Sequence, residues 1–258
     1  MTRLAVVSGG GSGIGRAVAA RFANMGDDVA IVGRRAGPLN ETAAEINGRI
    51  GRGAVHAMPA DLCLPDQVTS VAAELTKSGR PIDVIVNNAG GNFAPQRSDA
   101  SFERPVDLAG LADSWLKNVR GNVLPVVLLT HALLPSLRHP GGRIITISSV
   151  AASRGPAAYG GAKAALHIWS RELAGKLAAR GITVNVVAPG YVTGTEFYGD
   201  RMTPDFHEGR AKQAPMGRGA EPEEIAALVG HLADPASGFV TGQVIGIDGG
   251  ALIIRPSS

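Results

Sequence analysis

Short apolar runs recur along the chain, and segments with helical periodicity separate them. The runs Leu4–Val7, Val29–Val32 and Val84–Val86 are continuous rather than alternating. Continuous runs are typical of strands that helices cover on both faces, as in a parallel sheet. We expect such strands near residues 4–8, 28–33, 53–58, 82–87, 142–148, 182–187 and 242–248, and helices near 13–25, 39–50, 65–78, 107–138, 157–180 and 221–233.

The strict alternation of strands and helices predicts an α/β fold. Its core would be a doubly wound (Rossmann) parallel sheet of about seven strands, with helices on both faces and the ligand at the carboxyl edge of the strands. No linker, repeat or low-complexity tract divides the sequence, so we expect residues 1–258 to form a single domain. Turn residues interrupt the pattern near 191–215, which predicts a mobile lid. Its apolar side chains would face the ligand or pack on a core of their own: Tyr191, Phe197, Tyr198, Met202 and Phe206.

Composition narrows the function classes. The 258 residues carry a formal charge of only +3 with dispersed basic residues, so we expect no nucleic-acid partner. A single cysteine, Cys63, excludes an intrachain disulfide and a cysteine-based zinc site, and the histidines lack metal-ligand spacing, so no metal is expected. The longest apolar run, 123–135, is too short to span a bilayer, and no secretory signal is visible. These features predict a cytoplasmic protein without a membrane partner.

A glycine-rich segment, Ser8–Gly15, joins the first predicted strand to the first predicted helix. Its spaced glycines allow a tight turn, and the helix that follows directs free N–H groups at an anionic pyrophosphate. The spacing departs from the usual G-x-G-x-x-G fingerprint, and a turn without a ligand stays open as the alternative. The candidate cofactor-binding residues in this loop are Gly9, Ser12, Gly13, Ile14 and Gly15.

The second predicted strand ends at Gly33, and Arg34 and Arg35 follow it. At this point, dinucleotide-binding folds use an acidic residue to bind the ribose hydroxyls of NAD(H), or an arginine to accommodate the 2′-phosphate of NADP(H). No acid stands here, so NADP(H) is the preferred cofactor and NAD(H) the alternative. Arg34 is the first candidate to contact the phosphate, although a solvated arginine pair would look the same in sequence.

Two further segments follow predicted strands. Asp61 could accept a hydrogen bond from the adenine amino group or cap the helix that begins near Pro65, and the sequence leaves both open. After the fourth strand, the small and amide residues Asn88, Ala89 and Gly90 suit the close approach of a sugar. A bare turn would have the same residues.

Tyr159 and Lys163 are four residues apart in an alanine-rich segment, which places them on one helix face. A tyrosine hydroxyl has a pKa of ~10, and a neighbouring ammonium favours the phenolate and lowers that value. Ser149 follows a predicted buried strand and could donate a hydrogen bond to a carbonyl oxygen near Tyr159. Taken alone, the pair could equally be an exposed aromatic beside a solvated lysine.

Together these motifs resemble the short-chain dehydrogenase/reductase family, in its single-domain branch. The match covers nearly the whole chain, in the order Ser8–Gly15, Asn87–Gly90, Ser149, Tyr159-x3-Lys163, Asn185–Gly190 and Thr241–Gly250. The resemblance implies a single NAD(P)-binding Rossmann domain. It also implies hydride transfer between nicotinamide and a ketone or secondary alcohol, with a 3-oxoacyl thioester as a candidate substrate. Ser149 would polarise the substrate oxygen, Tyr159 would exchange its proton, and Lys163 would lower the pKa of Tyr159 and bind the nicotinamide ribose.

The family's fourth catalytic residue is an asparagine, for which this chain offers Asn118 and Asn122. Trp115, seven residues before Asn122, and Thr130, eight residues after it, match the family's spacing and select Asn122. Asn122 would hold a water that links it to Lys163, and Asn118 is expected on the outer face of the helix.

The resemblance also implies the cofactor contacts of the later segments and the assembly. Pro189 and Gly190 would begin the loop beneath the nicotinamide. There the backbone of Val192 and the hydroxyl of Thr195, in preference to Thr193, would meet the carboxamide. Ser12 stands where many NADP(H)-using relatives have a basic residue, which leaves Arg34 as the main phosphate contact. The helices at 107–138 and 157–180 pack against symmetry mates in relatives, so a homotetramer is expected and a dimer is second.

Two classes of function remain after this reasoning. The first is an NADP(H)-dependent oxidoreductase that acts on a small-molecule carbonyl or alcohol with the set Asn122, Ser149, Tyr159 and Lys163. The second is a nucleotide-binding sensor or scaffold with the same fold and no turnover. A protein without turnover has no reason to keep the complete set, which favours the enzyme.

Overall fold

All seven predicted strands are present, and they form one parallel sheet. The computed structural model describes residues 2–93, 107–201 and 203–253. The strand order is β3-β2-β1-β4-β5-β6-β7, so the order reverses between β1 and β4, as in a doubly wound fold. The strands are β1 Leu4–Ser8, β2 Asp28–Gly33, β3 Val55–Pro59, β4 Val84–Asn87, β5 Arg143–Ile147, β6 Thr183–Pro189 and β7 Val244–Ile247. The predicted fold class is therefore confirmed.

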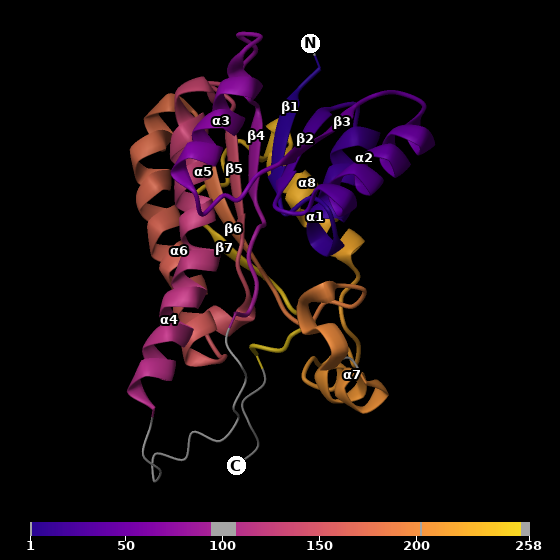
Figure 1. The fold of residues 1–258 in the computed structure, drawn as a ribbon, viewed down its shortest axis with the longest axis vertical. Coiled ribbons are helices and arrows are strands. Elements are labelled where there is room, and N and C mark those ends of the chain that lie inside the picture. Colours follow the sequence, from indigo (N-terminus) through magenta and orange to yellow (C-terminus); the bar gives the residue numbers. More distant parts are fainter. Residues whose placement is uncertain (1, 94–106, 202, 254–258) are drawn as a thin grey trace.

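The helices cover both faces of this sheet, as Figure 1 shows. Helices α1, α2 and α8 lie on one face, and α3, α4, α5 and α6 lie on the other. Short 3₁₀ segments follow several of them, and α7 stands apart beyond the carboxyl ends of the strands. The helices are α1 Gly13–Asn24, α2 Ala36–Ile50, α3 Pro65–Thr76, α4 Leu108–Asn122, α5 Leu124–Leu133, α6 Ala157–Leu177, α7 Pro204–Ala211 and α8 Pro222–Ala233.

The continuous apolar runs supply both layers of the core. Along β1, Ala5 and Val7 belong to the cluster beneath α1, α2 and α8, while Leu4 and Val6 belong to the cluster on the opposite face. This division follows from the two-residue period of a strand, which sends successive side chains to opposite faces. Every residue of β1, β4, β5 and β6 is buried, whereas the edge strands β3 and β7 are partly exposed. Burial on both faces is the property that the apolar runs predicted.

The prediction of a single helix at 107–138 is wrong. The structure divides it into α4, α5 and a 3₁₀ turn at Leu134–Ser136, with Val123 between the two helices. Pro125 lies in the first turn of α5, where its missing N–H needs no partner, whereas inside one helix it would remove a hydrogen bond. The expected outward position of Asn118 is also wrong, because this residue is fully buried.

Some boundaries differ from the prediction. Helix α2 begins at Ala36 rather than at 39, and α6 ends at Leu177, after which a 3₁₀ turn leads to Gly181 in the left-handed region (φ 69°). Helix α7 lies within the segment that was expected to be irregular. The side chain of Thr203 accepts a hydrogen bond from the Phe206 amide and caps α7, with Pro204 in its first turn.

Candidate active site

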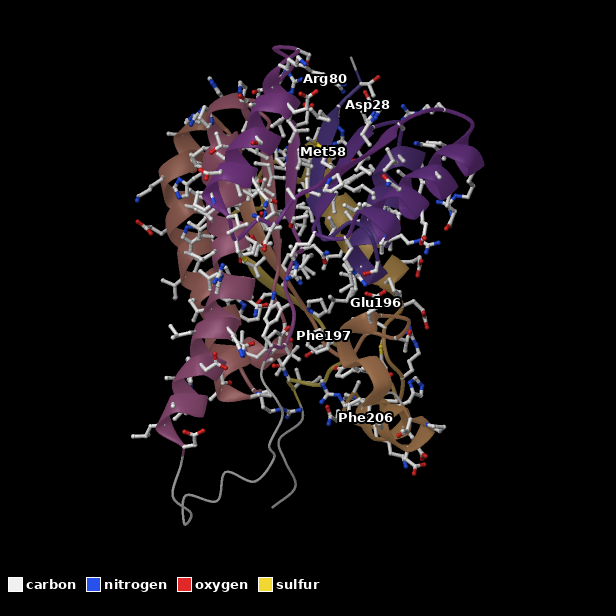
Figure 2. All side chains as sticks on the ribbon, viewed as in Figure 1. Asp28, Met58, Arg80, Glu196, Phe197 and Phe206 are labelled. Carbon is white, nitrogen blue, oxygen red and sulfur yellow. The ribbon has the colours of Figure 1, made fainter. Side chains whose placement is uncertain are left out.

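A cleft of about 1220 Å³ opens at the carboxyl edge of the sheet. Its walls come from the residues that follow β1, β4, β5 and β6, and from the segment 191–215, which we call the lid segment. Figure 2 shows Glu196, Phe197 and Phe206 of this segment below Asp28 and Arg80, with Phe206 the farthest from them. The cleft lies where a doubly wound sheet binds its ligand.

The glycine loop is shaped for close approach. Gly9 has a φ of 68°, in the left-handed region, and its amide donates to the Val32 carbonyl oxygen at 2.7 Å. A Cβ atom at Gly15 would collide with the Gly9 carbonyl oxygen, so only glycine allows α1 to start this near the loop. The N-terminus of α1 therefore faces the cleft with no side-chain cap, which fits an anionic pyrophosphate.

The loop after β4 is tied directly to the glycine loop. The hydroxyl of Ser8 accepts hydrogen bonds from the amides of Asn88 and Ala89 at 2.9 and 3.0 Å. The Asn88 side-chain amide donates in turn to the carbonyl oxygens of Ser8 and Gly9 at 3.1 and 3.2 Å. These four contacts fix the two loops as one rigid wall of the cleft.

Ser149, Tyr159 and Lys163 come together on the opposite wall. Tyr159 and Lys163 are 7% and 4% exposed, and the Lys163 ammonium lies 6.0 Å from the centre of the Tyr159 ring. Lys163 Nζ donates to the carbonyl oxygen of Ile147, the last residue of β5, at 3.1 Å. Ser149 follows that strand, and its Oγ accepts from the Ala151 amide at 3.1 Å.

Burial sets the charge state of this group. It raises the pKa of Tyr159 above its usual range, and the hydrogen-bonding interaction with Ser149 opposes that rise. The expected lowering of this pKa by Lys163 is therefore wrong, because burial is the largest cause of the shift. Burial also lowers the pKa of Lys163 from its ordinary value of 10.5 to about 8. At neutral pH the tyrosine is therefore a neutral acid beside a charged lysine.

Asn122 lies behind the cleft wall rather than on it. Its amide group pairs with the backbone of Gly91, with Nδ2 donating at 2.8 Å and Oδ1 accepting at 3.1 Å. Nδ2 also donates to the carbonyl oxygen of Asn118 at 2.9 Å. A Cβ atom at Gly90 would lie 2.7 Å from Asn122 Oδ1 and 3.2 Å from Lys163 Nζ. Asn122 and Lys163 thus both lie against Gly90.

Asn118 is buried because its amide also holds backbone. Its Oδ1 accepts from the Phe93 amide at 3.3 Å, and its Nδ2 donates to the Ser114 carbonyl oxygen at 3.0 Å. Both asparagines therefore attach the chain after β4 to α4. Because Asn118 binds this backbone, it faces the protein interior and not the outer face of the helix that was predicted.

The end of β2 lies across the cleft from the lid segment. Arg34 and Arg35 both line the cleft, and Arg35 forms an ion pair with Glu196 at 2.5 Å. The hydroxyl of Ser12 donates to the same carboxylate oxygen at 3.4 Å. No feature of the sequence connected residue 196 with residues 12 and 35, so sequence reasoning missed this contact.

Asp61 lines the same part of the cleft. Its Oδ1 accepts from the Cys63 amide at 2.9 Å, and the N-cap of α3 is Leu64 without a side-chain bond. The capping alternative for Asp61 is therefore wrong.

The chain after β6 separates the two candidate threonines. Thr193 is tied to Ala220, whose carbonyl oxygen accepts from its amide at 2.9 Å and its hydroxyl at 3.3 Å. The Thr195 hydroxyl lies 3.5 Å from the Val192 carbonyl oxygen, and its methyl would lie 3.2 Å from a Cβ atom at Gly13. Thr195 faces the glycine loop, whereas Thr193 is hydrogen-bonded to the backbone of Ala220. Pro189, Gly190 and Val192 line the cleft beside them.

Aromatic rings of the lid segment form a chain of contacts that ends on the tyrosine. The Phe197 ring packs against Tyr159 at 5.6 Å between centroids and against Tyr198 at 4.9 Å. Tyr198 contacts Phe206, and the Arg210 guanidinium lies 5.2 Å from the Tyr198 ring. Phe197 and Tyr198 line the cleft, whereas Phe206 is absent from its lining and packs on Tyr198. Both alternatives for the lid side chains are therefore found, each for different residues. Met202 lies outside the described residues.

His167 has a partner that sequence reasoning missed. Its Nε2 lies 2.7 Å from the hydroxyl of Ser148, which also donates to the Lys163 carbonyl oxygen at 3.4 Å. Burial, with Arg171 and Lys163 nearby, lowers the pKa of His167.

In residues 2–93, 107–201 and 203–253, no three His, Cys, Asp or Glu side chains are grouped to hold a metal ion. No helix in this part of the chain is long and apolar enough to cross a membrane.

The chain is similar to known proteins over nearly its whole length. The family model described as enoyl-(acyl carrier protein) reductase matches residues 9–251. The rhamnolipids biosynthesis 3-oxoacyl-[acyl-carrier-protein] reductase of Pseudomonas aeruginosa is 36% identical, over 96% of this chain and 95% of the relative. The acetoacetyl-CoA reductase of Shinella zoogloeoides is 35% identical, over 98% of this chain and 100% of the relative. The solved active-site complex of Pseudomonas aeruginosa RhlG with NADP has a TM-score of 0.84 at 36% identity and covers 96% of each chain. This chain belongs to the short-chain dehydrogenase/reductase family of oxidoreductases.

Proposed function

We propose that this protein is an NADP(H)-dependent reductase of a ketone, with Ser149, Tyr159, Lys163 and Asn122 as its catalytic set. The observation that carries the proposal is the convergence of a buried Tyr159, Ser149 and Lys163 on a cleft whose other wall is the glycine loop. The chain would act as one NAD(P)-binding domain, with residues 191–215 as its lid and a cytoplasmic location.

The cleft residues fit a nicotinamide dinucleotide. The N-terminus of α1 and the loop from Gly9 to Gly15 would hold the pyrophosphate, and Arg34 would bind the 2′-phosphate. Asp61, the backbone from Asn88 to Gly90, and the hydroxyl of Thr195 would hold the remaining polar groups. NADP(H) is preferred to NAD(H) because two arginines and no acid follow β2. The relative solved with NADP supports this choice.

The reaction follows from the positions of the hydroxyls. When bound, the reduced nicotinamide supplies a hydride to the carbonyl carbon. Ser149 Oγ donates a hydrogen bond to the substrate oxygen, and Tyr159 Oη donates the proton that this oxygen takes up. Because burial raises the pKa of Tyr159, its hydroxyl carries the proton at neutral pH. Lys163, charged below a pH of about 8, stabilises the phenolate that remains.

Phe197 and Asn122 support this chemistry in different ways. The Phe197 ring packs against the Tyr159 ring and contributes to its burial, which strengthens the electrostatic contacts of the site. Asn122 holds Gly91 and, through it, the position of Gly90 beside Lys163. A water between Asn122 and Lys163 would return the proton to Tyr159.

The candidate substrate is a 3-oxoacyl thioester. Two relatives act on this class by name, a 3-oxoacyl-[acyl-carrier-protein] reductase and an acetoacetyl-CoA reductase. The aromatic rings that lead from Tyr159 to Tyr198 would accommodate an apolar acyl chain.

The function is tested by mixing the purified protein with NADPH and a panel of ketones that includes acetoacetyl-CoA. We expect NADPH oxidation with at least one of them, and a fall in kcat of about 10²-fold or more for Tyr159→Phe. Binding of NADPH without turnover of any carbonyl compound would favour the sensor or scaffold. Near-normal turnover by Tyr159→Phe would refute the assigned proton donor.

The assembly we propose is a homotetramer, with a dimer as second choice. Helix α4 exposes an apolar stripe at helical spacing, and Ile168 of α6 adds to it with 68% exposure. Exposed apolar patches of this kind mark contact surfaces. The stripe consists of Leu108, Leu111, Trp115, Leu116 and Val119.

A further inference from the structure

Glu196 lies at the end of the cleft where an adenosine ribose would bind. Its Oε2 is 2.5 Å from the Arg35 guanidinium, and the Ser12 hydroxyl donates to the same atom at 3.4 Å. All three residues line the cleft. Figure 2 shows Glu196 on the lid segment beside Phe197. One carboxylate therefore bridges the glycine loop, the end of β2 and the lid segment.

This position is the one that selects between the two nicotinamide cofactors. In dinucleotide-binding folds, the residues after the second strand bind either the ribose hydroxyls or the 2′-phosphate. Here the two cations of that region are Arg34 and Arg35, and Arg35 is already paired with a carboxylate. A phosphate carries about −1.5 to −2 charges at neutral pH, so it repels Glu196 and competes with it for Arg35.

The neighbouring lid residues strengthen this link. Thr195 packs over Gly13, and Phe197 packs on Tyr159. Glu196 stands between them, so the contact that holds Arg35 belongs to the same short stretch that covers the reacting groups. A change in the ion pairing of Glu196 therefore affects a segment that contacts both the glycine loop and Tyr159.

We propose that Glu196 determines cofactor specificity, because its carboxylate competes with the 2′-phosphate of NADP(H) for Arg35 and Ser12. The proposal rests on the proposed function, since it takes the cleft to bind a nicotinamide dinucleotide. NADPH must displace Glu196, whereas NADH has no 2′-phosphate and leaves the ion pair intact. The wild-type protein should therefore prefer NADPH to NADH less strongly than it would if Glu196 did not occupy Arg35.

The test is the Kd of each cofactor for the wild type and for Glu196→Gln, measured by titration calorimetry without substrate. Glutamine keeps the size and removes the charge. The pair is solvent-exposed, so we expect NADPH to bind about 3- to 10-fold more tightly to the variant. The Kd of NADH should change less than about twofold.

The matched control is Glu45→Gln. Glu45 pairs with Arg16 on the surface, is 52% exposed, and is absent from the cleft wall. It removes the same charge, so equal tightening of NADPH by Glu45→Gln and Glu196→Gln would show a general effect of net charge and overturn the proposal. An unchanged or weaker NADPH affinity in Glu196→Gln would also overturn it.

Two further measurements separate this inference from the proposed function. Adenosine 2′,5′-bisphosphate and AMP are compared as ligands, because they differ only in the 2′-phosphate and lack the nicotinamide. Only the bisphosphate should bind more tightly to Glu196→Gln, and this gain should be lost when Arg35→Met is added. If only the bisphosphate binds more tightly to Glu196→Gln and no ketone is reduced, the proposed reaction is refuted and the role of Glu196 is supported. If a ketone is reduced and the two ligands respond alike, the role of Glu196 fails alone.

Discussion

The buried lysine of the active site should lower the stability of the fold, and Lys163→Met tests this. Lys163 is 4% exposed, and its Nζ donates to the carbonyl oxygen of Ile147 at 3.1 Å. Among the described residues, no carboxylate lies within ion-pair distance of it. Methionine has a similar length without a charge, so the substitution removes the buried ammonium and retains most of the packing.

The magnitude follows from the pKa. Burial lowers the pKa of Lys163 from 10.5 to about 8, which corresponds to about 3 kcal/mol. Methionine also leaves the Ile147 carbonyl oxygen without this donor, at a cost of about 1–1.5 kcal/mol. Lys163→Met should therefore be more stable than the wild type by about 2 kcal/mol at pH 7.

This difference should depend on pH in a defined direction. Between pH 8 and 10.5 the unfolded chain keeps a proton that the folded chain has lost, so the wild type gains stability as the pH rises. The variant has no such group. Its advantage should be constant below pH 8, shrink above it, and vanish near pH ~9.5.

The measurement is urea unfolding of both proteins between pH 6.5 and 9.5, with oligomeric state monitored at each pH. Lys176→Met serves as the control, because Lys176 lies on the same helix, is 68% exposed and pairs with Glu172. Its effect should stay within ~0.5 kcal/mol. A difference between wild type and Lys163→Met that is independent of pH, or a less stable variant at pH 7, would refute the buried-charge reasoning. Turnover should be lost in Lys163→Met regardless of its stability.

Three further outcomes are expected. Gly90→Ala should destabilise the protein by about 1–3 kcal/mol and reduce kcat, because its Cβ would lie 2.7 Å from Asn122 Oδ1; unchanged melting and turnover would contradict the cramped geometry. Leu116→Glu, at a side chain 69% exposed on α4, should shift the protein to smaller species in light scattering, and an unchanged mass would exclude this face from the interface. Arg34→Ala should weaken NADPH by about tenfold or more and NADH by less than threefold, and equal effects on both Kd values would contradict the phosphate assignment.

The fold was predictable because its signals are local. Continuous apolar runs identify strands buried on both faces, and Pro125 was a visible reason to expect a break in the long helix. Helix α7 also had a signal, the pair Thr203-Pro204, which caps and starts a helix. That signal lay among turn residues in a short helix with little apolar periodicity, and so the surrounding pattern outweighed it.

The positions of the candidate site residues were predictable where the local geometry allows only one residue type or one spacing. Gly15 must lack a Cβ atom, and Tyr159 and Lys163 must share a helix face. Asn118 shows where this reasoning ends: its burial depends on the Phe93 amide, which reaches it only through the tertiary fold. The contact of Glu196 with Ser12 and Arg35 has the same origin, because three distant segments meet there and none carries a motif that indicates the others.

One cause, burial, acts on both titrating groups of the site in opposite directions. It raises the pKa of Tyr159 and lowers that of Lys163, so the proton stays on the tyrosine while the charge on the lysine is costly to keep. In the proposed reaction, reduction needs a protonated Tyr159 and can start from this resting state. Oxidation needs the phenolate, which burial disfavours until an added charge or a higher pH offsets it. Reduction should therefore predominate at neutral pH, and oxidation should gain as the pH rises, because the same desolvation that destabilises Lys163 holds the proton on Tyr159.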